Sequence, residues 1–416
     1  MPKKKLGKPS LEEQVAAIKS ESKGPAGFSA AASTKADRLA GVLSKVNTQL
    51  KGAAVVRPLS EVKQSFHIRR PTGLTSLDLA IAGGFPAGSL CQFFGKEGAG
   101  KNYMTDQVIR NVQENYKDEA AVAYCSFGYG YDKRFGLLNG VAVAMNDEEV
   151  EVYRAERGQL TDAQEARCRR RVGTFHEICL GVTEQAIEKP AESMLEAVRS
   201  LILSGDYQVI IIDEANVALT REDVEKTLGE DPRQASLARL LTRFISKFYS
   251  DIKSIGPNGG PNETTLIAIL EARAQLGFSP DPNALSQTGG HSLKHAKAID
   301  VHYRPGTPIY YANDKKKPRI GKEITWKIDK AKLGSHEGAT GTFRFIWGQG
   351  ADFAGDLLGA AVDTGVLQLN GAWYSYGDTR LGCGAANAAE ALKDPELYAK
   401  LHSETMKAAG FNVAVK

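Results

Sequence analysis

The chain has few of the features that mark secreted, membrane-spanning or zinc-stabilised proteins. Its 416 residues include only 5 cysteines, an odd number, and no two of them form a C-x-x-C pair. A disulfide framework and a structural zinc site are therefore both disfavoured, and a reducing compartment is expected. No apolar run approaches the ~18–20 residues that a bilayer-spanning helix requires. The basic residues 3–5 are not followed by the apolar segment of a secretory signal, so we expect a cytoplasmic protein with no membrane partner.

A large excess of charge is also missing. The lysines and arginines number 53 and the acidic residues 49, so a nucleic-acid surface would have to come from local clustering. Apolar residues make up 42% of the chain and charged residues 25%, which is typical of a globular protein. At roughly 150 residues per domain, the length predicts two or three domains whose cores need no disulfide or metal.

The N-terminal part has two sections. Residues 1–33 are rich in Lys, Ala, Ser and Gly and poor in large apolar residues, which predicts a flexible basic tail. Beyond them, apolar residues recur every three or four positions and predict an amphipathic helix over 37–50. The pattern leaves open whether this helix packs on its own domain or on another subunit. A short strand is predicted over 53–57, so 34–60 is interpreted as a helix-and-strand segment.

Four short apolar runs indicate the fold class. They span residues 90–94, 120–124, 208–212 and 265–270 and are separated by helical stretches. Near-continuous apolar runs of this length suit strands that are buried on both faces of a parallel sheet. We therefore predict an α/β core with a mostly parallel central sheet.

Two other segments differ from this core, which is assigned to residues 61–350. Residues 145–180 are charged, helical in composition and rich in arginine. We interpret them as a helical insertion whose arginines form a solvated face rather than a DNA contact. Residues 351–416 are rich in Ala and Gly and are predicted to form a small α+β domain.

A glycine-rich segment follows the first of the predicted strands. It fits the pattern G-x-x-x-x-G-K and consists of Gly95, Lys96, Glu97, Gly98, Ala99, Gly100, Lys101 and Asn102. Glycines let backbone N–H groups converge on phosphate oxygens, and the N-terminus of a helix beginning near Tyr103 adds a favourable dipole. The ammonium of Lys101 can reach the outer phosphates. The segment therefore predicts a site for ATP.

Position 102 and a later strand end supply candidate ligands for Mg²⁺. Asn102 stands where this pattern usually has Ser or Thr, and its amide oxygen is still suited to a hard cation. Asp213 follows the apolar run 208–212, at the carboxyl end of the predicted strand. We therefore predict that Asn102 and Asp213 hold Mg²⁺, the alternative being that Asp213 only caps a strand end.

Several segments, taken in order, resemble the RecA family of DNA strand-exchange recombinases. They are residues 75–88 before the phosphate loop, 209–213 at the second nucleotide motif, 288–294 at the end of the second DNA-binding loop, and 371–377 with 382–387 in the C-terminal domain. The resemblance runs from about residue 35 to 410 and is interrupted by the insertion. It implies a RecA-like P-loop ATPase core, an N-terminal oligomerisation segment and a small C-terminal domain. A phage-encoded relative, acting in a bacterial or phage-infected cell, would fit the divergence.

The resemblance also assigns nucleotide-binding roles to single residues. Asp132 and Phe135 fall where the family contacts adenine, with Phe135 in place of a usual Tyr. In family filaments, lysines of a neighbouring subunit reach the nucleotide, and Lys294, Lys330 and Lys332 stand at matching positions. The 22 residues that end at Lys332 contain eight lysine or arginine residues and three acidic ones, a net charge of +5. This charge supports the assignment, although a solvated basic hairpin would have the same composition.

By the same resemblance, two loops bind DNA. Residues 230–235 match the first loop and residues 273–290 match the second. The candidate DNA-binding residues in and beside these loops are Arg233, Gln234, Arg239, Arg273, Gln275, Thr288, Gly289 and Gly290. The expected grip combines phosphate contacts with sequence-tolerant base contacts. The implied partners are single-stranded and double-stranded DNA, further copies of the chain in a helical filament, and mediator and single-strand-binding proteins.

Three hydrolytic positions depart from the family. The family's general base is a Glu whose position is held here by Gly128, and no carboxylate lies between residues 124 and 131. Glu271 stands where the family has a Gln, and Asn102 replaces a hydroxyl. Glu214 and Glu271 are the candidate replacement bases. Because losing a base typically costs ~10²–10⁴-fold in rate, slow hydrolysis with retained nucleotide binding is expected.

The favoured function is an ATP-dependent recombinase that forms a filament on single-stranded DNA and promotes homologous pairing and strand exchange. The alternative is a non-hydrolysing, nucleotide-bound accessory protein that coats DNA. A hexameric helicase-like or clock-like ATPase with the same broad core is a third option. The C-terminal segment around Trp373 disfavours it, because those relatives lack this module.

Overall fold

The computed structural model describes residues 34–51, 56–158, 160–183, 187–226, 235–253, 260–274, 285–286 and 295–411. The chain divides into two units, Met1–Lys63 and Gln64–Lys416. The predicted basic tail of residues 1–33 lies outside the described residues. Within those residues, no helix combines the length and the apolar composition needed to cross a membrane. All five cysteines are free thiols.

The first unit contains helix α2 (Lys35–Leu50), which confirms the predicted helix. Thr34 and Asp37 form a capping box at its start, because each side chain accepts the other residue's backbone N–H. No residue of α2 is buried, and Leu39 is 53% exposed. The strand predicted over 53–57 falls mostly outside the described residues, and its described part is not in a strand. The helix therefore carries an apolar stripe that is not buried within its own unit.

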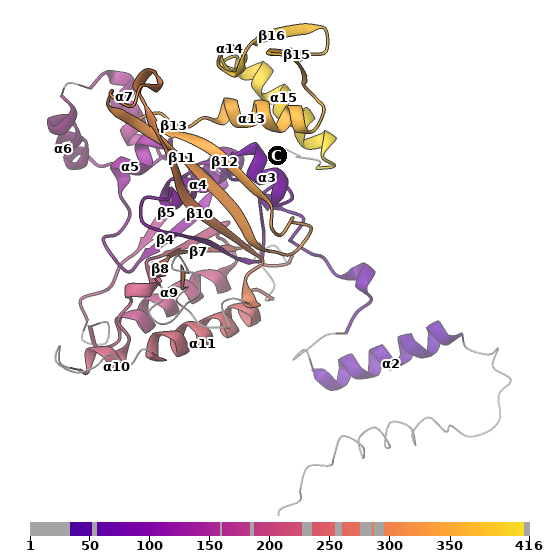
Figure 1. Cartoon of the computed structure of the whole chain (residues 1–416). Coiled ribbons are helices and arrows are strands. Elements are labelled where there is room, and N and C mark those ends of the chain that lie inside the picture. Colours follow the sequence, from indigo (N-terminus) through magenta and orange to yellow (C-terminus); the bar gives the residue numbers. More distant parts are fainter. Residues whose placement is uncertain are drawn as a thin grey trace, which may run out of the picture. The chain divides into compact units, whose positions relative to one another are not determined.

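In the described part of the second unit, nine strands form one sheet in the order β13-β12-β11-β10-β3-β7-β6-β4-β5 (Figure 1). Their bounds are β3 (Leu90–Gly95), β4 (Ala121–Ser126), β5 (Thr174–Ile178), β6 (Val209–Asp213), β7 (Thr265–Glu271), β10 (Ile299–Tyr310), β11 (Arg319–Ala331), β12 (Thr340–Ile346) and β13 (Gly350–Ala351). Neighbouring strands from β10 to β5 run parallel, whereas β10 to β13 pair antiparallel. The predicted α/β class with a mostly parallel sheet is confirmed.

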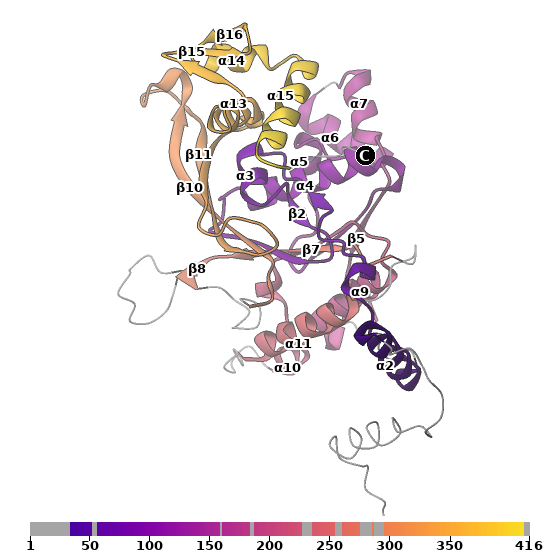
Figure 2. The same ribbon diagram turned by 90° about the vertical axis from the view of Figure 1, so that its right-hand side faces the viewer.

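Alternate residues of the central strands enter two different cores. In β6, Val209 and Ile211 belong to the cluster that includes α3 (Thr75–Ala80) and α4 (Lys101–Tyr116). Ile210 and Ile212 belong to the cluster built with α9 (Pro190–Ser204) and α11 (Ala235–Asp251). Helices therefore cover both faces of the sheet, with α9 and α11 together on one of them (Figure 2). This double coverage is the reason that the strands are continuously apolar.

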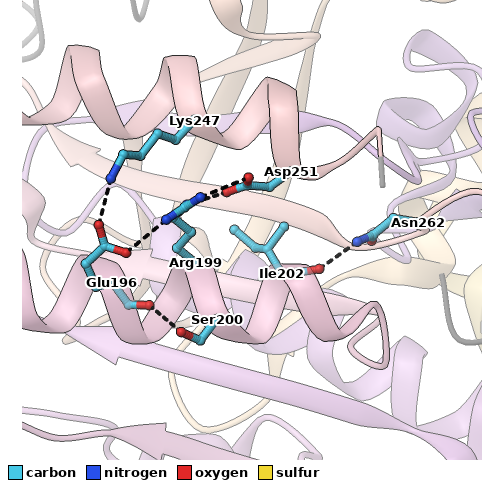
Figure 3. Close-up of polar contacts among 7 residues, drawn as sticks. All are labelled: Glu196, Arg199, Ser200, Ile202, Lys247, Asp251 and Asn262. Atoms are coloured by element: carbon cyan, nitrogen blue, oxygen red, sulfur yellow. Dashed lines mark hydrogen bonds and ion pairs between the residues drawn. The ribbon is translucent and has the colours of Figure 1, made fainter. Parts of the chain in front are cut away.

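Ion pairs hold α9 against α11, as Figure 3 shows. Arg199 Nε lies 2.6 Å from Asp251 Oδ2, and Lys247 Nζ lies 2.8 Å from Glu196 Oε1. The Asp251 side chain is buried, so its hydrogen bonds to the guanidinium satisfy a charge that is shielded from water. Asn262 Nδ2 donates to the carbonyl of Ile202 at 2.6 Å and joins the end of α9 to the segment before β7. These contacts fix α11, the helix that follows the predicted first DNA loop.

The predicted helical insertion over 145–180 is only partly helical. It contains α6 (Asp147–Arg157) and α7 (Asp162–Arg169), but it ends in β5, which pairs parallel with β4. The prediction of helix is wrong for this last part. An edge strand needs few apolar residues, so its sequence lacks the apolar run that indicates a strand. Phe175 packs against the α4 side of the sheet, and Ile178 packs against the α9 side. Four arginine side chains of this segment, Arg154, Arg167, Arg169 and Arg171, contact the chain itself, as in the bond from Arg167 Nη2 to the Leu137 carbonyl at 2.8 Å.

The C-terminal residues have a core of their own. They form α13 (Phe353–Asp363), a three-stranded antiparallel sheet of β14 (Gln368–Asn370), β15 (Trp373–Tyr376) and β16 (Thr379–Cys383), α14 (Ala385–Ala391) and α15 (Pro395–Ala408). Leu357, Leu367 and Leu401 are buried at the centre of this module. The backbone N–H of Ser76 in α3 donates to Asp356 Oδ2 at 3.0 Å and connects α13 to the main core.

Short elements complete the second unit. They are β1 (Arg69–Arg70), β2 (Phe85–Pro86), α5 (Lys133–Leu138), α10 (Arg221–Val224), β8 (Arg273–Ala274) and β9 (Leu285–Ser286). Short 3₁₀ turns are η1 (Leu59–Glu61) in the first unit, and η2 (Lys117–Glu119), η3 (Ala215–Val217) and η4 (Tyr311–Asn313) in the second.

Candidate nucleotide-binding and hydrolysis site

The glycine-rich loop connects β3 to α4, as the sequence predicts, although α4 begins at Lys101 rather than near Tyr103. Gly98 and Gly100 have φ of 67° and 91°, values at which a side chain is strained. At Gly95 a Cβ would lie 2.3 Å from the backbone oxygen of Tyr303. Only glycine lets the backbone of residue 95 pass this close to the backbone of Tyr303. The loop can therefore turn tightly at the N-terminus of α4. That arrangement suits the phosphate groups of a nucleotide.

The Lys101 side chain folds over the mouth of this loop. It is 8% exposed, and its Nζ donates to the carbonyl oxygens of Gly95 and Lys96 at 2.9 Å each. Burial lowers the pKa of Lys101, and the nearby carboxylates of Glu271 and Asp213 oppose that shift. Phosphate oxygens offer this ammonium stronger acceptors than two carbonyls, so the loop fits an anionic ligand.

The strand order gathers the other polar residues at the same edge. β3, β7, β6 and β4 are consecutive parallel neighbours, so their carboxyl ends lie together. Glu271 pairs with Gly95 across β7 and β3, and Asp213 pairs with Ser126 across β6 and β4. Ligands of open α/β sheets bind at this edge. The structure therefore brings Glu271, Asp213 and Glu214 together beside the phosphate loop.

Asp213 is held by hydrogen bonds that sequence reasoning did not foresee. Its Oδ2 accepts the hydroxyl of Tyr124 at 2.6 Å and lies 3.4 Å from Asn102 Nδ2. Burial raises the pKa of Asp213, and the Tyr124 hydrogen bond opposes that rise. Among the described residues, no group of three or more His, Cys, Asp or Glu could hold a metal. One carboxylate and one amide fit Mg²⁺ only in the manner typical of nucleotide sites, where phosphate oxygens and water complete the shell.

The carboxylate of Glu214 lies in space beside Gly128, within the stretch 124–131 that has no acidic residue of its own. A Cβ built on Gly128 would be 1.5 Å from Glu214 Oε2, so the Glu214 carboxylate fills the side-chain space of position 128. Glu214 has φ 54° and ψ 30°, a left-handed conformation that costs a non-glycine residue about 1–2 kcal/mol. Burial, followed by the charges of Asp213 and Glu271, raises the pKa of Glu214. The carboxylate that residues 124–131 lack is thus supplied beside Gly128 by Glu214, one of the two candidate replacement bases.

The two predicted adenine contacts lie at the start of α5. The Asp132 carboxylate accepts the backbone N–H groups of Arg134 and Phe135 at 2.9 and 3.1 Å, so it caps this helix. Phe135 is half-buried against the core. Their role in binding adenine stays a prediction.

A second lysine beside the loop was missed by the sequence analysis. Lys322 on β11 donates from Nζ to the carbonyl of Gly98. Close by in sequence, the Arg319 guanidinium lies 5.3 Å from the centre of the Trp347 ring. The net charge of +5 over residues 311–332 indicated a basic segment. It did not indicate which of its cations lies beside the phosphate loop of its own chain.

The lysines predicted to serve a neighbouring subunit lie at the other end of the sheet. Lys330 pairs with Asp300, which in turn pairs with Gln92, three residues before Gly95. At ~3.3 Å per residue, this places Lys330 roughly 10 Å back along the strands from the phosphate loop. Lys332 donates from Nζ to the carbonyl of His295 at 3.0 Å. Neither lysine is brought to the loop of its own chain, and Lys294 lies outside the described residues.

Most predicted DNA contacts cannot be placed. Arg233, Gln234, Gln275, Thr288, Gly289 and Gly290 lie outside the described residues. Arg239 is exposed on α11, and its Nη2 lies 2.8 Å from Glu222 Oε2. Arg273 begins β8, whose backbone pairs with β9 in a short antiparallel ladder. The DNA-binding role of all these residues stays a prediction.

Comparison with known proteins gives the family. Residues 355–410 match the family model of the RecA C-terminal domain. Protein RecA of Thermus thermophilus is 26% identical over 380 residues, which cover 91% of this chain and 96% of that protein. Protein RecA of Bordetella petrii is 27% identical over 386 residues and 92% of each chain. The chain is therefore similar to RecA along most of its length. Protein RecA of Syntrophus aciditrophicus is 25% identical over 343 residues, 82% of this chain and 84% of its own, so the similarity to RecA includes the core as well as the C-terminal module.

Proposed function

We propose that this RecA-family protein is an ATP-dependent recombinase that assembles as a helical filament on single-stranded DNA and pairs it with homologous duplex DNA. The observation that carries the proposal is the phosphate loop with Lys101 folded over it and Asp213 beside it. This site lies in a chain that is similar to Protein RecA of Thermus thermophilus over 91% of this chain's length. Mediator and single-strand-binding proteins are further proposed partners.

Each residue of the site has a defined task in this proposal. The backbone of the 95–100 loop and the ammonium of Lys101 bind the phosphate chain. Asn102 and Asp213 hold Mg²⁺ together with phosphate oxygens, and Tyr124 orients the Asp213 carboxylate through its hydroxyl. Bound MgATP supplies the transferable phosphoryl group and the charge that stabilises the assembled state.

Contacts between subunits couple the nucleotide to assembly. Lys330 and Lys332 lie at the sheet end away from their own phosphate loop. In a filament they would approach the nucleotide of an adjacent copy, as the family resemblance implies. Burial, followed by the charges of Lys332 and Lys297, lowers the pKa of Lys330, so an anionic ligand would relieve repulsion within this cluster.

Hydrolysis is proposed to be slow but retained. Asn102 lacks the hydroxyl that usually binds the cation, and the negative charge of Glu271 lies beside the loop where an amide is usual. Pairing itself exchanges one duplex for a similar one, so binding energy can support it. Turnover would then govern release of the filament from DNA.

A second function is favoured by one specific observation, the exchange of all three hydrolytic residues. In this alternative the protein coats DNA with nucleotide as a structural ligand and does not hydrolyse it. Electron microscopy of the protein with ATP and single-stranded DNA, beside a phosphate-release assay and a strand-pairing assay, separates the two. Filaments, pairing and slow DNA-stimulated release support the recombinase. Filaments without pairing or release support the accessory protein, and absence of ATP-dependent filaments contradicts both.

A further inference from the structure

We propose that Glu214 is the general base of ATP hydrolysis, and that Gly128 keeps open the space into which its carboxylate projects. The proposal rests on the proposed function, because it names the residue that performs hydrolysis at the same site. It also chooses between Glu214 and Glu271, the two candidate replacement bases.

The first support is mutual exclusion in space. A Cβ at position 128 would lie 1.5 Å from Glu214 Oε2 and 2.7 Å from its carboxyl carbon. No side chain at position 128 can therefore coexist with the present Glu214 carboxylate. By the resemblance, the family's base stands at the position that Gly128 holds here. The carboxylate of Glu214, which follows the neighbouring strand β6, reaches the space that this glycine leaves open.

The second support is the way the backbone directs Glu214. Glu214 comes directly after β6, and β6 lies between β7 and β4 in the sheet. Because Asp213 pairs with Ser126, the loop that follows β4 lies next to Glu214. Its φ of 54° turns the chain sharply at this point. Positive φ is uncommon for a residue other than glycine, and here it sets the direction in which the Glu214 side chain leaves the backbone.

The other candidate, Glu271, has a different role. It ends β7 beside Gly95 and is exposed. Its charge is the strongest electrostatic influence that raises the pKa of Lys101 against the effect of burial. Glu271 therefore balances the charge of the phosphate-binding lysine, while Glu214 lies at the position of the missing base.

The proton balance of the step is simple. Glu214 Oε2 accepts one proton from the attacking water as the water oxygen bonds to the γ-phosphorus. The bond from that phosphorus to the bridging oxygen breaks, and ADP leaves with the electron pair. The protonated carboxyl then returns its proton to solvent.

The test measures DNA-stimulated phosphate release, ATP affinity and filament length for a small set of variants. Glu214→Gln should lower kcat roughly 10²–10⁴-fold while ATP affinity changes little. Gly128→Ala should also lower kcat, because its Cβ displaces the carboxylate, the mobile end of a flexible side chain. Glu271→Gln is the matched control, and its effect on kcat should be at least ten times smaller than that of Glu214→Gln.

The decisive variant is the exchange Gly128→Glu with Glu214→Ser. It moves the carboxylate to the family's position, and it should recover at least tenfold of the kcat lost in Glu214→Ser alone. Gly128→Glu alone should lose activity, because two carboxylates then compete for one space.

Three results would overturn the proposal: a Glu214→Gln kcat within threefold of the unmodified protein, an exchange variant no faster than Glu214→Ser, or no measurable turnover by the unmodified protein. Normal ATP affinity and filaments in the variants show that the fold is intact. If Glu214→Gln abolishes release in a protein that forms no filaments on DNA, the base assignment stands and the recombinase proposal fails.

Discussion

A buried ion pair at the start of β10, hydrogen-bonded to the strand that leads into the phosphate loop, gives a quantitative test of the architecture. The side chains of Lys297 and Asp300 are 2% and 3% exposed and form an ion pair at the start of β10. Gln92, on the strand that leads into the phosphate loop, donates from Nε2 to Asp300 Oδ1 at 3.1 Å. Removing the carboxylate leaves a buried ammonium without its charged partner.

We expect Asp300→Asn to reduce the free energy of unfolding by about 3–5 kcal/mol, the usual cost of breaking a buried pair from one side. At 1.36 kcal/mol per power of ten, this lowers the folding equilibrium constant roughly 10²–10⁴-fold. Replacing both partners with apolar residues of similar volume, Lys297→Met with Asp300→Leu, should cost less than about 1.5 kcal/mol, because no uncompensated charge remains.

Equilibrium unfolding in urea, followed by tryptophan fluorescence, measures both values. Trp326 is 2% exposed on β11, in the same sheet as the ion pair, so its emission reports on this core. The single variant should lower the midpoint at an unchanged slope. A loss below about 1 kcal/mol for Asp300→Asn, or an equal loss in the double variant, would refute the reasoning that the pair is buried and mutually dependent.

Three further predictions concern assembly and catalysis. Lys330→Ala with Lys332→Ala should weaken ATP-dependent filament assembly at least tenfold while leaving the circular dichroism of the free protein unchanged; unchanged ATP dependence would contradict a role toward the neighbouring subunit. Deleting residues 1–52 should give a folded monomer that forms no long filaments, measured by light scattering and microscopy, because the exposed stripe of α2 is then lost; normal filaments would show that α2 packs within its own chain. The kcat for hydrolysis should rise with pH through a pKa above the ordinary glutamate value, because burial and the neighbouring carboxylates of Asp213 and Glu271 raise the pKa of Glu214 and the base acts only when deprotonated; a limb at the ordinary value would count against the assignment.

Local patterns in the sequence were sufficient for the phosphate loop and for the four central strands β3, β4, β6 and β7. The apolar run 208–212 predicts a strand with an acidic residue after it, and β6 ends at Asp213. The glycines of the 95–100 segment predict a tight turn before a helix, and the structure has that turn. These predictions hold because strand periodicity and glycine conformation depend on residues that are adjacent in the chain.

Some elements were predictable only in part. The charged segment that contains β5 has too few apolar residues to indicate a strand, since an edge strand is supported by one neighbour and by single residues on each face. Similarly, the basic composition near Lys322 and Lys330 indicated a site for anions. It did not separate the lysine beside its own phosphate loop from the lysine at the far end of the sheet.

The choice of Glu214 over Glu271 as the proposed base depended on tertiary structure. Read along the chain, the residues around Gly128 contain no carboxylate, and Glu214 is one of two distant candidates. The placement of β6 between β4 and β7 brings Glu214 into the space above Gly128. Sequence by itself determined the four central strands and the phosphate loop and indicated the resemblance to RecA, because each rests on short stretches of chain. Only the folded sheet decided which carboxylate occupies the site, because strand order is set by packing between residues that are far apart in sequence.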